Sequence, residues 1–388
     1  MRATRAEVDL SAIYTNTKQV ISKVGQKVRV LGVVKANAYG HGLVQVAKTL
    51  IKSGATYFGV ALAEEGVALR QYVDLPILVF SPPTDENLES YVRFDLDATI
   101  NSMETVYALD AFASGVGKKA RVQLKVDTGM GRLGFFPRNA VEAFRAIRNL
   151  KAVTLVGVYS HFATSDESNK EFAKRQLGSF KNVVAAMKDL GAMGPVEGQN
   201  ENAAGSPIFH MANSGAILDL PGSYFDMVRP GIMTYGYYPS LETSQSVQVR
   251  PAFALRSNIV QVKTFQPGTS VSYGRKYFTK KSERIAVVPI GYADGYTRLL
   301  TGRTSVLIRG RKFPVVGTVT MDHIMVGLAD DFEIQVGDEV TLLGRNGDLE
   351  ISAWDLASQI GTIPYEILCM ISGRVPRVYL NTDSSITD

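Results

Sequence analysis

The sequence predicts an N-terminal (β/α)8 barrel of the TIM type over residues 1–240, followed by a mainly antiparallel β-strand domain over residues 241–388. The length of 388 residues suits two domains better than one. Short apolar runs alternate with amphipathic stretches in the first part, which is typical of parallel strands with helical crossovers. With about eight such units, a closed barrel fits better than an open sheet. No Gly-x-Gly-x-x-Gly motif follows the first run, which argues against a dinucleotide-binding fold.

The expected barrel strands are rich in β-branched residues and lie at regular spacing along the chain. They are the runs 28–34, 57–62, 76–80, 96–100, 121–126, 154–160, 207–213 and 225–231. The stretches 43–54, 103–115 and 170–191 have the apolar periodicity of amphipathic helices. A polar segment around 194–207 is expected to form a surface loop.

The pattern changes after the polar, turn-rich segment 237–251, which we interpret as a linker. Beyond it, β-type runs are separated by short segments that carry Gly, Pro and Asp, as in antiparallel sheets. These runs are 253–265, 284–293, 304–310, 313–319, 324–328 and 338–344. A helical stretch is expected at 352–361.

Composition limits the possible functions. The formal net charge of +5 is spread thinly, without the Lys/Arg block of a nucleic-acid-binding arm, and fits an enzyme with anionic ligands. Cys369 is the single cysteine, which excludes an intrachain disulfide and a thiolate zinc site and favours a reducing compartment. Four histidines leave little material for a metal site, so we expect none.

The first ten residues lack the apolar core of a signal peptide, and no apolar run approaches the roughly 18 residues of a membrane span. We therefore expect a cytoplasmic protein that does not associate with membranes or nucleic acid.

Polar residues gather at the carboxyl ends of the expected barrel strands. In a (β/α)8 barrel these ends open onto one face, where the active site lies. The residues concerned are Lys35, Lys125, Asp127, His161, Asn213, Ser214 and Arg229. Their joint placement, more than any one of them, predicts an active site at this face.

Lys35 directly follows an apolar run, within the segment GVVKANAYGHG. A lysine in such an apolar setting is desolvated, which favours the neutral amine and permits Schiff-base chemistry with an aldehyde cofactor. The alternative is a structural ion pair at the barrel mouth. The lysine alone does not decide between the two.

Several segments in both parts of the chain are similar to those of the alanine racemase family, in the family's order and spacing. They include VVKANAYGHG (33–42), LKVDTGMGRLGF (124–135), YSHFATSDE (159–167), MANSGAIL (211–218), DMVRPGIMTYG (226–236), VSYGRKY (271–277), VPIGYADGY (288–296), GTVTMDHIMV (317–326) and IPYEIL (363–368). The resemblance implies pyridoxal 5′-phosphate as cofactor and interconversion of L- and D-alanine, which supplies D-alanine for peptidoglycan. It also implies a head-to-tail homodimer in which each active site combines one chain's barrel with the partner's β domain.

The resemblance assigns catalytic roles to two residues. Lys35 is expected to hold the cofactor and to act as the base on one face of the substrate α-carbon. Tyr273, from the partner subunit, is expected to be the base on the opposite face. An ordinary phenol, with a pKa of about 10, is a poor base at neutral pH. The resemblance places His161 against this tyrosine and Arg229 against His161, and such a cationic network would stabilise the phenolate. Without the flanking motifs, Tyr273 would be interpreted as a packed strand aromatic and His161 as a structural histidine.

The resemblance also implies that Arg229 faces the pyridine nitrogen of the cofactor. A guanidinium there leaves that nitrogen unprotonated, which makes the cofactor a weaker electron sink. A salt-bridge residue at a domain boundary is the alternative.

The phosphate of the cofactor has hydroxyl and backbone N–H groups as implied partners, which suit a phosphate near a helix start. They belong to Tyr39, Ser214, Gly231, Ile232 and Tyr365. Ser214 by itself would be an ordinary helix cap.

For the substrate carboxylate, Arg132 is the natural bidentate partner, and the resemblance adds the backbone of Met321. Lys125 matches a position that carries a carbamate in some family members and thereby orients the arginine. A direct ion pair of Lys125 with Asp127 or another carboxylate remains the alternative.

Tyr292 and Tyr365 resemble residues that narrow the access channel and so favour a small side chain. Thr320 and His323 depart from the Cys and Gln expected there, which affects fine substrate choice. The alternative function is a related racemase of serine, lysine or broad specificity. A non-catalytic, single-barrel cofactor-binding protein is disfavoured, because such a protein has no need of a second domain bearing Tyr273.

Overall fold

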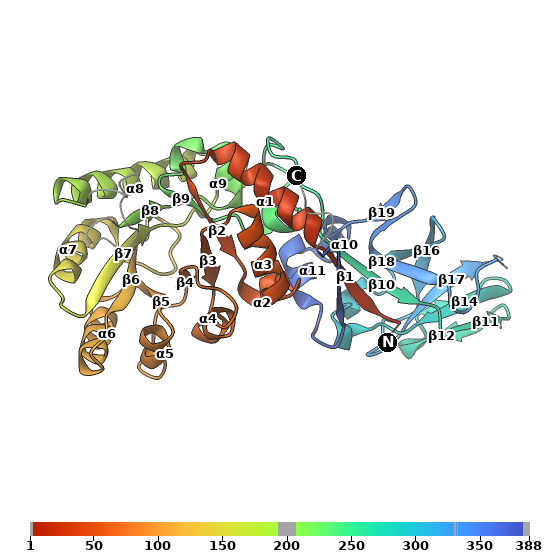
Figure 1. Cartoon of the computed structure of the whole chain (residues 1–388). Coiled ribbons are helices and arrows are strands. Elements are labelled where there is room, and N and C mark those ends of the chain that lie inside the picture. The colour runs from red at the N-terminus through yellow and green to blue at the C-terminus, as the bar shows by residue number, and fades with distance from the viewer. Residues whose placement is uncertain (1–2, 193–206, 330, 332, 383–388) are drawn as a thin grey trace. The chain divides into compact units, whose positions relative to one another are not determined.

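A computed structural model describes residues 3–192, 207–329, 331 and 333–382 (Figure 1). The chain forms two compact units. Of the described residues, one unit comprises 12–38, 43–192 and 207–250, and the other comprises 3–11, 39–42, 251–329, 331 and 333–382. The units thus divide at residue 250 rather than at the expected 240, and the N-terminal residues belong to the β unit. The loop expected around 194–207 lies, except for residue 207, outside the described residues.

The first unit is a closed barrel of eight strands in the order β2 to β9, all paired in parallel, with β9 returning to β2. Each expected run overlaps one strand, so the predicted barrel is confirmed. The strands are β2 Arg29–Val33, β3 Tyr57–Val60, β4 Ile77–Val79, β5 Leu96–Ile100, β6 Ala120–Lys125, β7 Val153–Tyr159, β8 Ile208–His210 and β9 Met227–Val228. In β3, β4 and β5 every residue is buried, because parallel strands of a barrel are covered on both faces.

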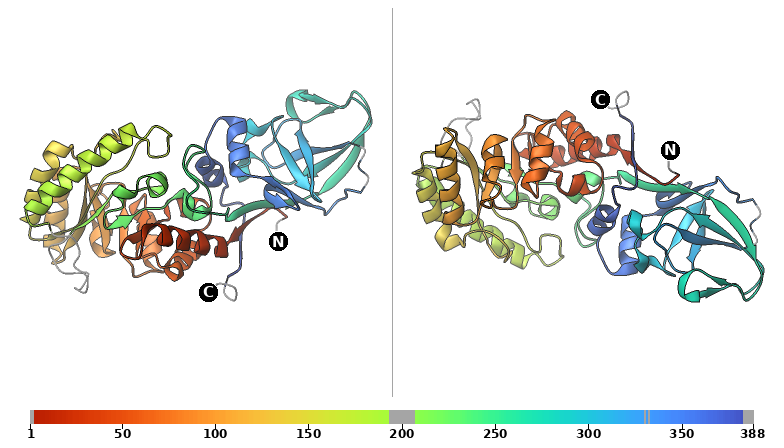
Figure 2. Two further views of the ribbon diagram at one scale, coloured as in Figure 1. Left: turned by 90° about the horizontal axis from the view of Figure 1, so that it is seen from above. Right: turned by 90° about the horizontal axis from the view of Figure 1, so that it is seen from below.

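Helices surround the barrel strands on the outside (Figures 1 and 2). They are α1 Leu10–Val24, α3 Leu43–Ser53, α4 Ala63–Arg70, α5 Leu88–Arg93, α6 Met103–Gly115, α7 Pro137–Arg148, α8 Glu171–Asp189 and α9 Ser214–Asp219. Helix α7 shows why they pack there: Ala140, Ala143, Phe144 and Ile147 lie on one face and are buried. The helices expected at 43–54, 103–115 and 170–191 are confirmed as α3, α6 and α8.

The second unit is built on an antiparallel sheet of strand order β11-β14-β17-β16-β15-β18-β10-β1-β20. Its strands are β1 Arg5–Asp9, β10 Phe253–Asn258, β11 Gln261–Phe265, β14 Glu283–Val288, β15 Ser305–Ile308, β16 Arg311–Val316, β17 Ile324–Ala329, β18 Glu339–Asn346, β19 Leu349–Ile351 and β20 Arg377–Leu380. A separate hairpin joins β12 Ser270–Val271 to β13 Tyr277–Phe278. The expected β domain is confirmed, with one parallel pairing, between β1 and β20.

Two helices accompany this sheet. The helix expected at 352–361 is α10 Ala353–Ile360, which begins at a capping box between Ser352 and Asp355. It is followed by α11 Pro364–Met370, which starts with a proline. Within the described ranges, no helix has the length and apolar character needed to cross a membrane.

Candidate active site

The barrel unit brings the expected polar residues to the carboxyl ends of its strands. Lys125 is the last residue of β6, and Ser214 begins α9 shortly after β8. Arg229 directly follows β9, and Lys35 and His161 each follow the last residue of their strand by two positions. Because all eight strands run in parallel around a closed barrel, these side chains share one face.

Lys35 begins a left-handed turn, α2 Lys35–Tyr39, that the sequence did not predict. Ala36, Asn37, Ala38 and Tyr39 have φ angles of 53°, 53°, 54° and 51°. Residues with a Cβ atom are disfavoured in this conformation, so the turn requires outside support. Within the barrel unit, Glu65 accepts a hydrogen bond from the Ala36 amide at 2.6 Å, and Asn37 accepts one from the Leu43 amide at 2.8 Å. The turn therefore fixes the chain immediately beyond the lysine.

Arg229 lies buried between two histidines. Its Nη1 is 2.6 Å from Nδ1 of His210, and its Nη2 is 3.2 Å from Nδ1 of His161. Nη2 also donates to the carbonyl groups of Ser160 at 2.7 Å and Met211 at 3.1 Å. Burial lowers the pKa of Arg229 to about 10, so the guanidinium remains cationic at neutral pH. Burial, and then Arg229, hold the pKa of both histidines well below the ordinary range. The positive charge of this group is therefore on Arg229, and the histidines are neutral.

Lys125 is buried above the ring of Tyr159, with Nζ 4.5 Å from the ring centroid. Burial, followed by repulsion from Arg229 and Arg132, lowers the pKa of Lys125 to about 7. Attraction by the Asp127 carboxylate opposes this lowering of the pKa of Lys125 but does not outweigh it. A substantial fraction of this amine is therefore neutral near pH 7, as carbamate formation requires.

Asp127 instead organises the glycine-rich turn that carries Arg132. Its carboxylate accepts hydrogen bonds from the backbone N–H groups of Gly129 at 2.9 Å, Gly131 at 3.1 Å and Arg132 at 3.2 Å. Burial opposes ionisation of this carboxyl group, but these bonds outweigh it and lower the pKa of Asp127. Gly134 closes the turn with a φ of 121°, where a Cβ would lie 2.8 Å from the Asp127 nitrogen. The turn presents the exposed Arg132 from a fixed backbone.

The hydroxyl of Ser214 meets the segment after β9. Its Oγ accepts hydrogen bonds from the backbone N–H of Gly231 at 3.0 Å and of Met233 at 3.5 Å. Gly231 precedes the short 3-10 helix Ile232–Tyr235, and Ser214 itself begins α9. Neutral donors at two helix starts, with no acidic group among them, fit a phosphate group.

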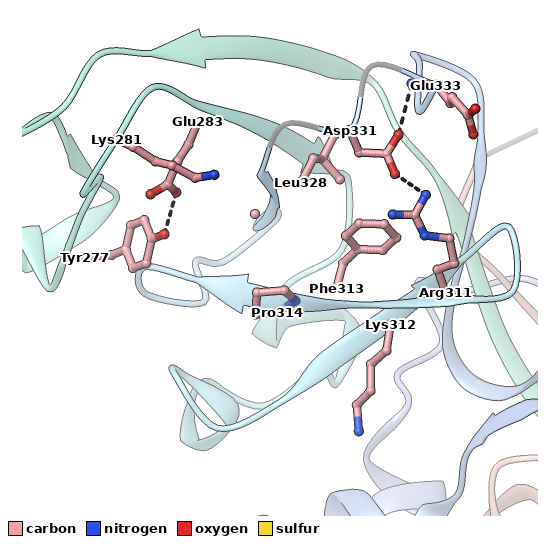
Figure 3. A pocket seen from close by; sticks show the side chains of 11 residues that line it. Tyr277, Lys281, Glu283, Arg311, Lys312, Phe313, Pro314, Leu328, Asp331 and Glu333 are labelled. Atoms are coloured by element: carbon pink, nitrogen blue, oxygen red, sulfur yellow. Dashed lines mark hydrogen bonds and ion pairs between the residues drawn. The ribbon is translucent and has the colours of Figure 1, made fainter.

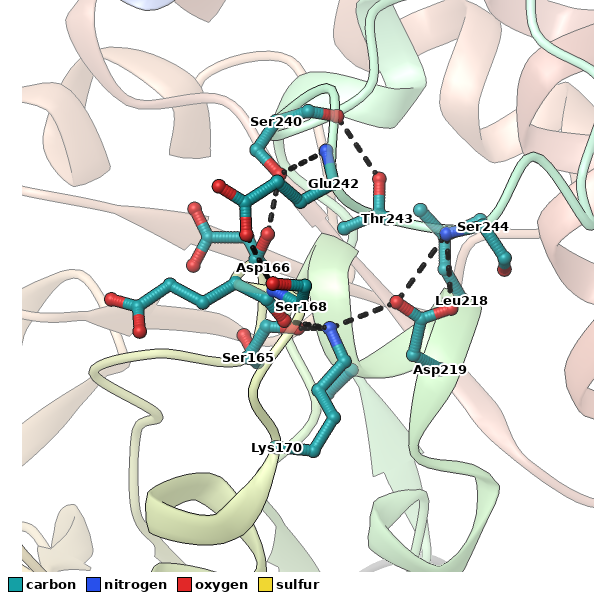
Figure 4. Close-up of polar contacts among 12 residues, drawn as sticks. Ser165, Asp166, Ser168, Lys170, Leu218, Asp219, Ser240, Glu242, Thr243 and Ser244 are labelled. Atoms are coloured by element: carbon teal, nitrogen blue, oxygen red, sulfur yellow. Dashed lines mark hydrogen bonds and ion pairs between the residues drawn. The ribbon is translucent and has the colours of Figure 1, made fainter.

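A network of polar contacts fixes the loop that follows His161 (Figure 4). Lys170 Nζ is 3.0 Å from the Asp219 carboxylate at the end of α9 and donates to the Ser165 carbonyl at 2.9 Å. Ser165 Oγ donates to Asn213 at 2.7 Å, and Asn213 in turn caps α9 through the Ala216 amide. The loop that carries His161 and the helix that begins with Ser214 are thus held together.

The β unit positions the remaining expected residues. Tyr39 is buried, with its ring centroid 6.0 Å from that of Tyr365, and burial followed by Tyr365 raises the pKa of Tyr39. Tyr273 is 72% exposed, so it is not a packed strand aromatic. Thr318 Oγ1 donates to the Tyr273 carbonyl at 2.7 Å.

Two further side chains are exposed on the β unit near the segment 318–321. Tyr292 donates its backbone N–H to the Thr320 carbonyl at 3.0 Å, and Ala293 donates to the Met321 carbonyl at 3.1 Å. Tyr292 is 42% exposed and Met321 51% exposed. The segment 318–321 is thus hydrogen-bonded to the backbone beside the three exposed residues that the β unit contributes to the expected site, Tyr273, Tyr292 and Met321.

Three polar residues of the barrel interior were missed by the sequence analysis: Asp97, Gln123 and His210. Each is completely buried, and His210 contacts Arg229 directly. A signal for them was present, because each is a polar residue within or at the end of a short strand run of the barrel.

A separate hollow of about 890 Å³ lies in the β unit (Figure 3). Tyr277 donates to Glu283 at 2.5 Å in this hollow, and Arg311 pairs with Asp331. None of the expected site residues lines it, and we assign it no part in the chemistry.

Fold and site together define a two-domain barrel enzyme with a lysine at the barrel mouth. Family models agree with this class over nearly the whole chain. The alanine racemase N-terminal domain matches residues 8–239, and the alanine racemase C-terminal domain matches residues 252–379. The chain belongs to the alanine racemase family.

Individual relatives are similar over nearly their full length. The alanine racemase of Halothermothrix orenii is 41% identical over 381 residues, which cover 98% of this chain and 97% of the relative. The structure of the alanine racemase from Clostridium difficile 630 has a TM-score of 0.91 at 40% identity, covering 98% of this chain and 96% of that one. The Bacillus anthracis alanine racemase, solved with bound L-Ala-P, has a TM-score of 0.90 at 35% identity, covering 100% of this chain and 97% of that one.

Proposed function

We propose that this chain interconverts L- and D-alanine, using pyridoxal 5′-phosphate held on Lys35. Family membership supports the reaction. The observation that carries the proposal is the meeting of Lys35, the Arg229 guanidinium and the Ser214 donor group at one face of the barrel. This set fits the cofactor, because it offers an amine for an aldehyde, a cation for a ring nitrogen and neutral donors for a phosphate. When bound, the cofactor supplies an electron sink that makes the α-proton of an amino acid removable.

The residues of the barrel hold and tune the cofactor. Ser214 and the backbone of Gly231 and Ile232 bind the phosphate, together with Tyr39 and Tyr365. Arg229 faces the ring nitrogen and, being cationic at neutral pH, does not readily pass it a proton. An unprotonated ring nitrogen weakens the electron sink, which favours return of the proton over side reactions.

Two bases exchange the α-proton from opposite faces. The Lys35 amine works on one face and Tyr273 of the partner subunit on the other. The exposure of the Tyr273 side chain supports this role, because a base supplied to another chain must be accessible. His161 is neutral and turns Nδ1 toward Arg229, so its proton lies on Nε2. That N–H is available to donate to a phenolate, while the stabilising positive charge comes from Arg229 rather than from a protonated histidine.

The substrate carboxylate binds Arg132, with the backbone of Met321 as a second partner. The neutral amine of Lys125 adds to the carbon of carbon dioxide and releases one proton to solvent, and the resulting carbamate anion accepts a hydrogen bond from Arg132. The lowered pKa of Lys125 supports this modification. Tyr292 and Tyr365 narrow access to the site and restrict it to a small side chain.

The active enzyme is a head-to-tail homodimer. The exposed Tyr273, Tyr292 and Met321 on the β unit support this assembly, because large apolar side chains held in fixed positions at a surface are typical of an interface. Each site then uses one barrel and the β unit of the partner.

The direct test is a purified-enzyme assay with the L and D forms of alanine, serine and lysine, with products separated by chiral chromatography. We expect alanine to be racemised with by far the highest kcat/KM. The matched variant Lys35→Ala should lose both racemisation and the visible absorbance of lysine-bound cofactor. Faster racemisation of serine or lysine would identify a different racemase, and full activity of Lys35→Ala would refute the role of the lysine.

A further inference from the structure

A line of buried polar side chains crosses the interior of the barrel and ends at Arg229. Asp97 on β5 accepts a hydrogen bond from Gln123 Nε2 on β6 at 2.8 Å. Gln123 Oε1 is 2.7 Å from His210 Nε2 on β8, and His210 Nδ1 is 2.6 Å from Arg229 Nη1. All four side chains are at most 3% exposed. The strands that carry them are labelled in Figure 1.

Such a line has to be explained, because barrel interiors are normally filled with apolar side chains and a buried polar group is costly unless it is hydrogen-bonded. Within the described part of the chain, no side-chain hydrogen bond joins Asp97 or Gln123 to a residue to which a cofactor or substrate role was assigned above. Gln123 is linked to Arg229 through His210. Their effect on the site must therefore pass through that imidazole.

The direction of each hydrogen bond follows from Asp97. Its other oxygen accepts from Arg121 Nε at 2.7 Å, so the carboxylate is paired with a cation and can only accept. Gln123 must consequently turn its NH₂ group toward Asp97 and its oxygen toward His210. An oxygen there can only accept, which requires the proton of His210 to lie on Nε2.

The same proton position suits the other side of the ring. His210 is neutral because burial and Arg229 lower its pKa, so Nδ1 carries a lone pair that faces the Arg229 donor. If the Gln123 amide were reversed, its NH₂ group would face His210 Nε2, and the proton of His210 would have to lie on Nδ1. The N–H groups of His210 Nδ1 and Arg229 Nη1 would then oppose each other at 2.6 Å. Tyr159 stacks on the imidazole, with centroids 4.9 Å apart and planes 7° apart, and prevents the ring from turning away.

We infer that Asp97 and Gln123 are positioning residues of the active site: they fix the Nε2-protonated tautomer of His210 and thereby the orientation of the Arg229 guanidinium. For its meaning in catalysis this inference rests on the proposed function. The tautomer itself is a property of the protein that can be measured without substrate.

The decisive variant is Asp97→Asn, which keeps the size of the side chain and removes its charge. The new amide keeps its oxygen toward Arg121 and turns its NH₂ group toward Gln123, whose own amide then rotates and presents N–H to His210. Tyr57→Phe is the matched control, because the Tyr57 hydroxyl also donates to Asp97 and accepts from Gln123 Nε2, yet lies outside the line to His210. Each variant changes the hydrogen bonds at position 97, but only Asp97→Asn should change which nitrogen of the His210 ring carries the proton.

The measurement is the ¹⁵N NMR spectrum of the holoenzyme labelled in its four histidines, with the His210 signals assigned by their loss in His210→Gln. We expect a protonated Nε2 in the wild type and in Tyr57→Phe, and a signal moved toward protonated Nδ1 in Asp97→Asn. An unchanged tautomer in Asp97→Asn, or the same change in Tyr57→Phe, would overturn the inference. If Asp97→Asn does not fold, Gln123→Met removes the acceptor of the Nε2 proton at similar volume and should move the Nε2 resonance away from its hydrogen-bonded position. An unchanged Nε2 resonance there would overturn the inference equally.

Activity provides a second readout. In Asp97→Asn we expect kcat for alanine to fall about tenfold, with KM little changed because the line does not contact the substrate. In Tyr57→Phe both constants should stay within about twofold. If the wild-type enzyme shows the Nε2-protonated tautomer of His210 but does not racemise alanine, the proposed function is refuted and this inference stands.

Discussion

Among single residues, Lys125 has the environment least like that of an ordinary lysine. It lies buried over Tyr159, and the positive charges of Arg229 and Arg132 repel its ammonium form. Burial in this setting lowers its pKa to about 7. Only the neutral amine adds to carbon dioxide. The product is a carbamate, an anion that the positive charges of Arg229 and Arg132 stabilise.

We therefore predict a carbamate on Lys125 whose amount rises with pH. Because the folded-state pKa is lowered to about 7, the neutral fraction is small near pH 6 and large near pH 8. Enzyme equilibrated with ¹³C-bicarbonate should show a carbamate signal in ¹³C NMR that grows over this range. The signal should vanish in Lys125→Ala and persist in Lys118→Ala, which removes an exposed lysine. A wild-type spectrum without the signal at pH 8 would rule out the modification.

Among the elements, α2 is the one whose conformation is least expected from its residues. Four consecutive residues with side chains adopt the left-handed region, at a cost of about 1–2 kcal/mol each. Hydrogen bonds to the side chains of Glu65 and Asn37 offset part of this cost. The strain is placed directly beside Lys35, where a fixed lysine position is required.

Ala36→Gly tests this strain. Ala36 is exposed, so its methyl group contributes little packing, while glycine adopts a φ of 53° without penalty. We expect the free energy of unfolding to rise by up to about 1 kcal/mol, measured as a higher denaturant midpoint. Ala111→Gly, at an exposed position of the right-handed helix α6, should lower it by about 1 kcal/mol. Equal destabilisation by both substitutions would show that the turn is not strained in solution.

The elements also show how far local sequence determines this fold. The eight barrel strands were predictable because each is a short apolar run, bounded by polar residues. The left-handed turn was not, because Ala and Asn carry no signal for it and one of its supports, Glu65, is 29 residues from Ala36. Strand β1 escaped prediction for a similar reason: five residues with alternating burial become a strand only through β10 and β20, from the distant end of the chain.

The same distinction holds for the site. Residues at strand ends could be placed together from sequence, because parallel strands of a barrel end at one face. Asp97 and Gln123 lie inside strands and His210 is the last residue of β8, and their hydrogen-bonding line depends on the pairing of β5 through β8. Only the assembled barrel reveals it.

At the scale of the whole molecule, the proposal requires two chains for each site. Lys35→Ala and Tyr273→Phe homodimers should each be inactive, since each lacks one base. Mixed under conditions that exchange subunits, they should regain activity, because one site of each heterodimer then combines an intact barrel with an intact β unit. Proven exchange without recovered activity would show that Lys35 and Tyr273 serve sites within one chain.

The central claim, that Lys35 and Tyr273 work on opposite faces of the substrate, has a direct test in solvent-deuterium exchange. Tyr273→Phe keeps the aromatic ring and removes the ionisable oxygen, so racemisation should fall by orders of magnitude in both directions. Lys35 can still remove the α-proton of D-alanine and return a deuteron to the same face. We therefore predict that, in this variant, D-alanine exchanges its α-proton for deuterium without inversion while L-alanine hardly exchanges, as followed by ¹H NMR. Equal residual exchange from both enantiomers would contradict the account, because it would mean that a single base serves both faces.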